Sequence, residues 1–319
     1  MDFRAATAAV TEASTIAVMG HIRPDADAIG SVTTVLQALH QLGKTASGWI
    51  GQPEAFAANL LSIPLADQIT CATELPKADL YVVLDCGSLD RTGAFSSALS
   101  DTDTPIIMVD HHASNTGFGT WQLLDPTAES TTTILRAWLR DLGVELTTSI
   151  AHSIYAGLVT DTGSFRWGRP AMHELAGELV ATGINTRCIA GALMDDVSIP
   201  GLRMVGQVLS AITVPEIDGH RVAILTATHD LIQGCAMNEV ESLVDYVRGV
   251  GAADVGAVFK EYRPGWFAVS LRTTKDIDVS AIAARIGGGG HVRAAGYTTT
   301  GTVAEVHQEL LAAVGAVLN

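Results

Sequence analysis

The chain has 319 residues, 48% of them hydrophobic and 17% charged, which excludes a disordered protein and allows two domains with buried cores. Thirty-four acidic and nineteen basic residues give a formal net charge of −15. A protein that binds long nucleic acid through its phosphates needs a basic stripe, and this composition cannot supply a large one. We therefore expect any phosphate-bearing substrate to be small or to be held at one end.

The first half of the chain alternates short apolar runs with amphipathic segments, a pattern typical of a mainly parallel sheet flanked by helices. The expected strands and helices are, in chain order, residues 15–19 (strand), 26–42 (helix), 79–84 and 105–109 (strands), and 131–142 and 150–159 (helices). The last of these helices places Asp161 just beyond its end.

The second half predicts a smaller α/β domain in which two strands form a hairpin around Arg263-Pro264-Gly265. The expected elements are residues 221–226, 255–262 and 266–272 (strands) and 239–247, 279–286 and 303–318 (helices). The composition shifts near Pro200-Gly201. We therefore predict a first domain over residues 1–186, a linker over 187–212 and a second domain over 213–319.

No apolar run is long enough to cross a bilayer, so we expect no contact with a membrane. The first residues lack the basic flank and apolar core of a signal peptide. The chain has four cysteines that form no C-x-x-C pair, at Cys71, Cys86, Cys188 and Cys235. A reducing cytoplasm is the expected location.

The densest set of chemical groups is the segment 21–31, HIRPDADAIGS, between the first expected strand and helix. It supplies the imidazole of His21 and the carboxylates of Asp25 and Asp27. Ligands of parallel sheets gather outside the carboxyl ends of the strands, where this segment is expected to lie. Three more groups follow expected strands or a helix, at Asp85, at Asp110-His111-His112 and at Asp161.

A lone aspartate at a strand end is usually a cap or turn residue, and a lone histidine is more often structural than a ligand. This structural explanation does not suit four such groups at one sheet edge, because unneutralised carboxylates repel one another. The pattern therefore indicates a metal centre. Two other phosphate-site patterns fail: Gly43-Lys44-Thr45 follows a helix and lacks the first P-loop glycine, and Asp25-x-Asp27 does not directly follow a strand.

These motifs resemble those of the DHH phosphoesterase family, which is named for a triplet like Asp110-His111-His112. The similar segments are, in chain order, residues 21–31 (H-x-x-x-D-x-D-x-x-G-S), Asp85, residues 110–112, residues 160–163 (TDTG) and residues 288–296 (G-G-G-H-x-x-A-A-G). The last resembles the C-terminal domain associated with the family. In the order of its motifs and in its length, the chain best resembles a branch of short family members, the bifunctional oligoribonucleases (nanoRNases) and phosphoadenosine-phosphate phosphatases.

The resemblance implies two divalent cations, Mn²⁺ first, with Mg²⁺ or Co²⁺ as substitutes. Two such ions activate a water and stabilise the leaving oxygen. His112 is implied to contact the scissile phosphate as a catalytic residue rather than as a ligand. The implied ligands are His21, Asp25 and Asp85 for one ion and Asp27, Asp85, His111 and Asp161 for the other, with Asp85 as a catalytically essential bridge.

The resemblance also implies that the second domain binds the substrate in a cleft between the domains. Arg272 is similar to a phosphate-contacting arginine of the family, and His291 would hydrogen-bond a phosphate or sugar. A glycine run allows close approach of the backbone to a nucleotide, and Gly30-Ser31 at a helix start would offer backbone donors. The implied substrate-binding residues are Ser31, Arg272, Gly288, Gly289, Gly290 and His291.

Together these implications describe a manganese-dependent hydrolase of short oligoribonucleotides and adenine dinucleotides, pApA and cyclic di-AMP among them, which also dephosphorylates 3′-phosphoadenosine 5′-phosphate. We expect a homodimer that forms no stable complex with long nucleic acid. Two alternatives stay open, a manganese-dependent inorganic pyrophosphatase of the same family and a non-catalytic nucleotide-binding sensor. A non-catalytic sensor is expected to lack one or more of the family's metal ligands, whereas this sequence has a matching residue at all six ligand positions.

Overall fold

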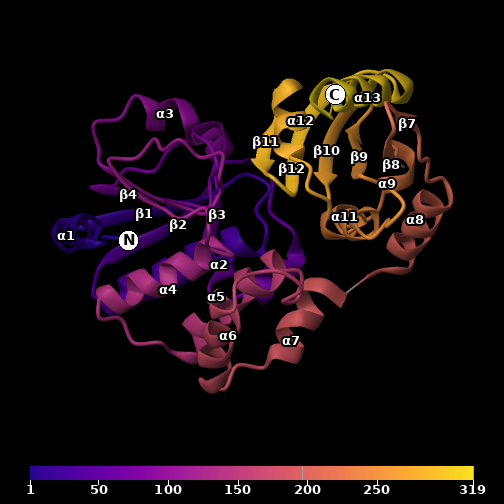
Figure 1. Cartoon of the computed structure of the whole chain (residues 1–319). Coiled ribbons are helices and arrows are strands. Elements are labelled where there is room, and N and C mark those ends of the chain that lie inside the picture. The colour runs from indigo at the N-terminus through magenta and orange to yellow at the C-terminus, as the bar shows by residue number, and fades with distance from the viewer. Residues whose placement is uncertain (196, 319) are drawn as a thin grey trace. The chain divides into compact units, whose positions relative to one another are not determined.

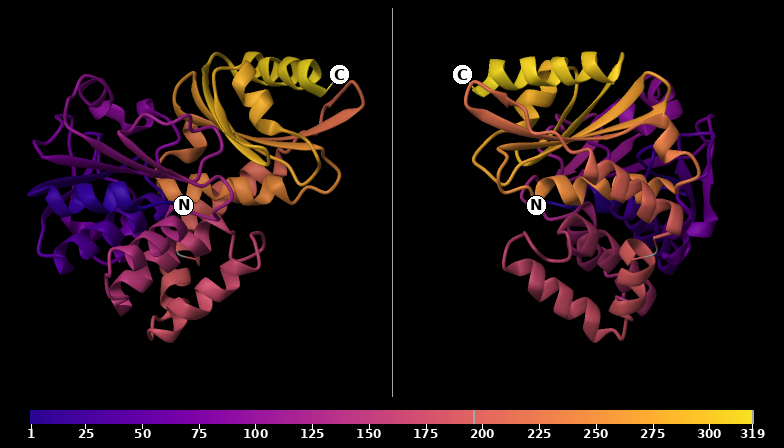
Figure 2. Two further views of the ribbon diagram at one scale, coloured as in Figure 1. Left: turned by 60° about the vertical axis from the view of Figure 1, so that its left-hand side comes forward. Right: turned by 90° about the vertical axis from the view of Figure 1, so that its right-hand side faces the viewer.

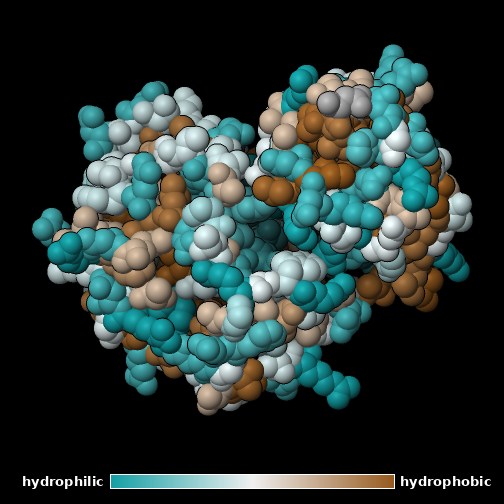
Figure 3. All heavy atoms as spheres, viewed as in Figure 1, coloured by the Kyte–Doolittle hydropathy of each residue, from teal (hydrophilic) through white to brown (hydrophobic). Residues whose placement is uncertain are grey.

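The computed structural model describes residues 1–195 and 197–318, and the chain divides into two compact units, residues 1–196 and 197–319 (Figure 1). Among the described residues, no helix has the length and apolar character needed to cross a membrane. On the face shown in Figure 3, hydrophobic residues lie in separate groups among hydrophilic ones. Each unit is built around its own six-stranded sheet.

The sheet of the first unit is entirely parallel, with the strand order β3-β2-β1-β4-β5-β6. The order reverses between β1 and β4, which are neighbours in the sheet although β2 and β3 separate them in the chain. Such a reversal opens a crevice at the carboxyl ends of the strands. The strands are β1 Thr15–Gly20, β2 Thr45–Ile50, β3 Ile69–Cys71, β4 Leu80–Leu84, β5 Ile106–Asp110 and β6 Trp121–Leu124.

Helices cover both faces of this sheet, and alternate strand residues face each layer (Figure 1). In β1, Ile16 and Val18 face α2, α4 and α5, whereas Ala17 and Met19 face η3 and α3. The helical segments are α1 Arg4–Glu12, α2 Ala26–Gln41, η1 Ala58–Ser62, η2 Ala66–Gln68, η3 Leu89–Phe95, α3 Ser96–Ser100, α4 Thr131–Asp141, α5 Thr148–Asp161, α6 Ala171–Ala181, α7 Thr186–Ala190 and the π-helical turn Gly191–Asp195.

Helices α2 and α5 pack closely because Gly30 of α2 has no side chain. A Cβ at this position would lie 2.5 Å from the main-chain oxygen of Ser153 in α5. The Ser153 hydroxyl also bonds to two side chains of α2, with Thr33 Oγ1 at 2.9 Å and Gln37 Nε2 at 3.1 Å. The residues that begin α2 are thereby fixed relative to α5.

The second unit has a mixed sheet with the order β11-β12-β10-β9-β8-β7, parallel only between β8 and β9. Helices α12 and α13 pack on one face, and α8 to α11 pack on the other (Figure 2). The elements are α8 Ile199–Ser210, β7 Glu216–Ile217, β8 His220–Ala227, α9 His229–Ile232, α10 Met237–Glu241, α11 Leu243–Arg248, β9 Val255–Arg263, β10 Trp266–Arg272, α12 Val279–Arg285, β11 Gly289–His291, β12 Ala294–Thr300 and α13 Val303–Leu318.

The α/β class with a mainly parallel first sheet is confirmed, and the predicted linker and one predicted helix of the second unit differ from the expectations. The predicted linker, residues 187–212, contains most of α7 and all of α8, which buries Met204 and Val208 in the core of the second unit; residue 196 lies outside the described residues. The single helix expected over 239–247 is interrupted at Ser242. Residues 289–291 of the glycine-rich segment form the short strand β11.

We predict that Gly30→Ala destabilises the protein. The added methyl group must displace the backbone of α5 at Ser153, and overpacking of this kind costs about 1–3 kcal/mol. Urea unfolding followed by circular dichroism measures the change. Gly177→Ala in α6 is the matched control, because its Cβ meets nothing within 4 Å and alanine favours a helix. A Gly30→Ala protein as stable as the wild type would contradict the close-packing explanation.

Candidate metal centre

Three neighbouring strands of the first sheet end in candidate ligands. His21 follows β1, Asp85 follows β4, and Asp110-His111-His112 ends and follows β5. The edge includes the point between β1 and β4 where the strand order reverses. The expected placement of these groups at one sheet edge is therefore found, and the structure brings them within contact distance of one another.

Asp85 lies at the centre of the cluster and is buried, with 2% of its surface exposed. Its Oδ2 lies 3.5 Å from Nε2 of His21, and its Oδ1 lies 3.6 Å from Nε2 of His111. Each carboxylate oxygen thus faces a different imidazole, which is the arrangement expected of a bridging ligand. The backbone of Asp85 has φ +57°, a left-handed conformation that is unfavourable for a residue with a Cβ.

The first group of ligand atoms comes from His21, Asp25 and Asp85. Asp25 caps α2, because its Oδ1 accepts hydrogen bonds from the backbone N–H groups of residues 27 and 28, while its Oδ2 lies 3.6 Å from Nε2 of His21. Nδ1 of His21 lies 2.9 Å from both Ile22 O and Arg91 Nη2, which leaves Nε2 as the nitrogen that faces the carboxylates. Asp25 is the accessible member, with 59% of its side chain exposed.

The second group comes from Asp27, Asp85 and His111, and Asp161 extends it. Asp27 is fully buried, and Asp161 Oδ2 lies 3.3 Å from Nε2 of His111. Asp161 is the last residue of α5 rather than the residue after the helix, and its main-chain oxygen accepts a hydrogen bond from Trp167 Nε1 at 2.7 Å. All six predicted ligands therefore lie in one cluster of the first unit.

Burial, together with the charges of Asp85 and Asp25, raises the pKa of Asp27 well above its usual range. Burial and Arg91 act to lower the pKa of His21, but Asp25 and Asp85 outweigh them and raise it to about 9. The cluster thus holds more negative charge than its own side chains neutralise. Its donors are carboxylate oxygens and imidazole nitrogens, a set that fits Mn²⁺ and related divalent cations.

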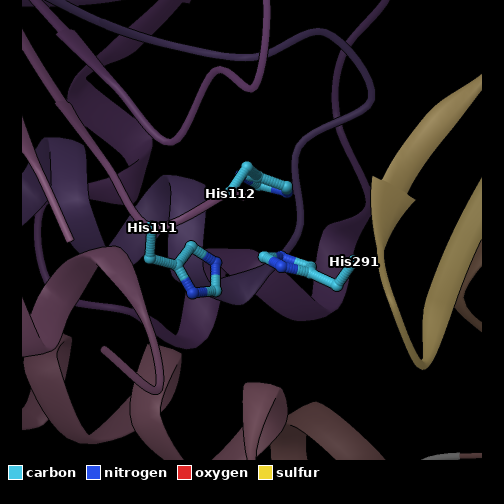
Figure 4. Close-up of side chains that lie close together, drawn as sticks. All are labelled: His111, His112 and His291. Carbon is cyan, nitrogen blue, oxygen red and sulfur yellow. The ribbon is translucent and has the colours of Figure 1, made fainter. Parts of the chain in front are cut away.

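His112 differs from His21 and His111 in that its Nδ1 contacts a carboxylate rather than a backbone oxygen. Its Nδ1 lies 2.7 Å from Asp110 Oδ1, and Asn115 Nδ2 donates to the other oxygen of Asp110 at 2.7 Å. Burial acts to lower the pKa of His112, but the hydrogen bond to Asp110 and the charge of Asp85 raise it overall. Figure 4 shows the rings of His111 and His112 beside each other, with centroids 4.9 Å apart. The role of Asp110 in orienting His112 was not predicted from the sequence.

Two threonines at the start of α4, Thr131 and Thr132, also contact the cluster. Their N–H and hydroxyl groups donate to Asp27 and Asp85 over 2.6–3.1 Å. Neither residue is among those that the sequence motifs predict. The only sequence signal is the run Ser130-Thr131-Thr132-Thr133, which is typical of a helix N-terminus and does not reveal a contact with residues far away in the chain.

The candidate substrate residue Ser31 is not accessible. It is fully buried and is the sixth residue of α2, beyond the first four residues whose backbone N–H groups are available to a ligand. The expectation that Gly30-Ser31 forms a phosphate-binding helix start is therefore wrong, because α2 begins at Ala26 and Gly30 serves helix packing.

The other substrate candidates lie in the second unit. Arg272 ends β10, and its Nη1 donates to Leu271 O at 2.9 Å. His291 ends β11. The glycines before it are needed by the sheet itself, since a Cβ at Gly288 would lie 2.2 Å from Gly296 O and Gly290 has φ +141°. A contact of Arg272, Gly288, Gly289, Gly290 or His291 with a substrate stays a prediction.

Comparisons with known proteins give consistent matches along the chain. Residues 15–158 match the model of the DHH family, N-terminal domain, and residues 222–319 match that of the DHHA1 domain. The chain is 31% identical over 304 residues to the bifunctional oligoribonuclease and PAP phosphatase NrnA of Thermus thermophilus, covering 94% of this chain and 89% of the relative.

Two solved structures share the fold. An exopolyphosphatase-related protein from Bacteroides fragilis superimposes with a TM-score of 0.85 at 23% identity, over 98% of this chain and 95% of the other. RecJ from Thermus thermophilus, solved in complex with Mn²⁺, superimposes with a TM-score of 0.55 at 16% identity, over 98% of this chain and 54% of RecJ.

We predict that Gly157→Ala weakens Mn²⁺ binding at least about tenfold, the size of effect usual when the surroundings of a ligand are disturbed. Gly157 lies in α5 beside Asp27, and a Cβ there would lie 2.2 Å from Asp27 Oδ1 and 2.6 Å from Thr132 Oγ1. The carboxylate must therefore move. Calorimetric titration with Mn²⁺ measures the affinity, and Gly206→Ala, whose Cβ meets nothing within 4 Å, is the control. Wild-type affinity in Gly157→Ala would show that Asp27 tolerates displacement.

Proposed function

Because the chain belongs to the DHH family of phosphoesterases, we propose that it is a divalent-cation-dependent hydrolase of short oligonucleotides and adenine dinucleotides that also dephosphorylates 3′-phosphoadenosine 5′-phosphate. The observation that carries the proposal is the cluster around Asp85, in which two imidazoles and buried carboxylates converge at one sheet edge. The name of the Thermus relative supports the substrate class.

Two cations, Mn²⁺ by preference, would be held by the groups described above: His21, Asp25 and Asp85 on one side, and Asp27, Asp85, His111 and Asp161 on the other. When bound, the pair supplies positive charge that stabilises a phosphoryl transition state and activates water. The RecJ structure, of the same fold and solved with Mn²⁺, supports the choice of metal. Asp85 is essential in this proposal because it belongs to both groups.

His112 supplies acid catalysis in this proposal. Asp110 fixes its ring through Nδ1, so Nε2 is the nitrogen that hydrogen-bonds a phosphate oxygen and protonates the leaving oxygen. The raised pKa of the imidazole, caused by Asp110 and Asp85 against the effect of burial, favours the protonated form that this role requires. The substrate would be bound through Arg272, Gly288, Gly289, Gly290 and His291 of the second unit, in which Arg272 and His291 are partly exposed.

A panel of substrates tests the proposal. The purified protein with Mn²⁺ is assayed with phosphoadenosine phosphate, pApA, cyclic di-AMP, short RNAs and pyrophosphate, beside Asp85→Asn, which removes one charge from both cation groups. We expect turnover of the nucleotides by the wild type and none by Asp85→Asn. Turnover of pyrophosphate alone would favour the pyrophosphatase alternative, and nucleotide binding without turnover would favour the sensor.

A homodimer and a cytoplasmic location belong to the same proposal.

We predict that Arg272→Ala lowers kcat/KM for nucleotides about ten- to a hundredfold, because a charged hydrogen bond to phosphate contributes about 1.5–3 kcal/mol. The Mn²⁺ content, measured by elemental analysis, should stay at the wild-type level. Arg263→Ala is the matched control, since Arg263 is exposed at the other end of the same hairpin and its loss changes the net charge equally. Unchanged kcat/KM in Arg272→Ala on every nucleotide would contradict the assigned contact.

We predict that kcat/KM falls as RNA length increases from two to about ten nucleotides. With a formal net charge of −15, each additional phosphate adds repulsion rather than binding, and few counterions are released. Single-turnover cleavage of a length series at two salt concentrations measures both effects. Faster cleavage of longer RNA, or a steep dependence on salt, would indicate a basic binding track.

A further inference from the structure

Asp27 is held at both carboxylate oxygens by the first two residues of α4. The backbone N–H of Thr131 donates to Oδ2 at 2.6 Å, and Thr132 donates to Oδ1 from its N–H at 3.1 Å and from its hydroxyl at 2.8 Å. All three residues are fully buried. A buried carboxylate bonded at both oxygens cannot rotate without breaking these hydrogen bonds.

The same pair of threonines also reaches the central carboxylate. Thr131 Oγ1 donates to Asp85 Oδ1 at 2.9 Å. Asp27 and Asp85 come from different parts of the chain, 104 and 46 positions before Thr131. Two consecutive residues therefore set the separation of two acidic groups that would otherwise repel each other.

Helix capping does not account for these hydroxyl groups. Ser130 already caps α4, because its hydroxyl accepts a hydrogen bond from the backbone N–H of Thr133 at 3.1 Å. The hydroxyls of Thr131 and Thr132 donate to the two carboxylates instead, and Thr132 Oγ1 also lies 2.8 Å from Ser130 Oγ. The backbone N–H groups at the start of α4 also carry a partial positive charge, which lies beside the Asp27 carboxylate. On its other side, α5 leaves room for the carboxylate only because residue 157 is glycine.

We propose that Thr131 and Thr132 are positioning residues, which fix Asp27 and Asp85 in the orientation that receives a cation before the cation binds. The inference rests on the proposed metal centre and assigns it two residues that are not ligands. Preformed ligands lose less conformational freedom on binding, so the hydroxyls contribute directly to cation affinity.

Isosteric substitutions test the proposal in the full-length protein without substrate. Thr132→Val and Thr131→Val remove one hydroxyl each and keep the shape, and Thr132→Ser keeps the hydroxyl. Calorimetric titration should show the Kd for Mn²⁺ raised about 10–100-fold in each valine variant and nearly restored in the serine variant. Thr133→Val is the matched control, because Thr133 Oγ1 lies 3.0 Å from Ser130 Oγ rather than from a ligand.

The unfolding temperature in EDTA separates positioning from general stability. A double variant, Thr131→Val with Thr132→Val, that binds Mn²⁺ with wild-type Kd overturns the proposal, whatever its unfolding temperature. If a valine variant does not fold, Thr132→Ser and Thr132→Ala make the same comparison, since they differ only in the hydroxyl, and equal Kd values overturn it too. Asp85→Asn with wild-type Kd would instead overturn the metal centre itself.

Discussion

Repulsion between buried carboxylates is the constraint on which the first unit depends. Several acidic side chains converge where β1, β4 and β5 end, and Asp27, Asp85 and Asp110 among them are buried, where charges are poorly screened. Three of these carboxylates each accept hydrogen bonds from their own donors. Asp25 caps α2, Asp27 accepts from the start of α4, and Asp110 is shared by His112 and Asn115. Helices α2 and α4 therefore supply the donors of Asp25 and Asp27, whereas the loop after β5 supplies those of Asp110.

Close helix packing is the second requirement, and glycine provides it twice. Gly30 lets α2 approach the backbone of α5, and Gly157 lets α5 pass beside the Asp27 carboxylate. Both positions act through the absence of a side chain, so neither contributes a chemical group to the site. The arrangement of the acidic and imidazole side chains at this edge thus depends on the packing of α2, α4 and α5 as well as on their own hydrogen bonds.

The sequence predicted that the candidate ligands lie together, because each stands beside a recognisable strand or helix end, so that motif and local structure coincide. It did not predict Thr131 and Thr132, since their partners lie far away in the chain and a threonine run reads only as a helix start. Ser31 was misassigned because its motif resembles a phosphate-binding helix start, whereas α2 already begins at Ala26. The predicted linker was placed by composition, which does not show that α8 packs on the second sheet.

The left-handed backbone conformation of Asp85 lowers the stability of the folded protein. A side-chain-bearing residue with φ near +57° pays a local conformational cost, of order 1–3 kcal/mol, that glycine escapes and that aspartate and asparagine bear less than other residues. Replacing Asp85 by glycine relieves this cost, and replacing it by glycine or asparagine removes a negative charge from a crowded, buried cluster. Without cations, Asp85→Gly and Asp85→Asn are thus expected to fold more stably than the wild type. Selection for stability alone would therefore favour the loss of this aspartate.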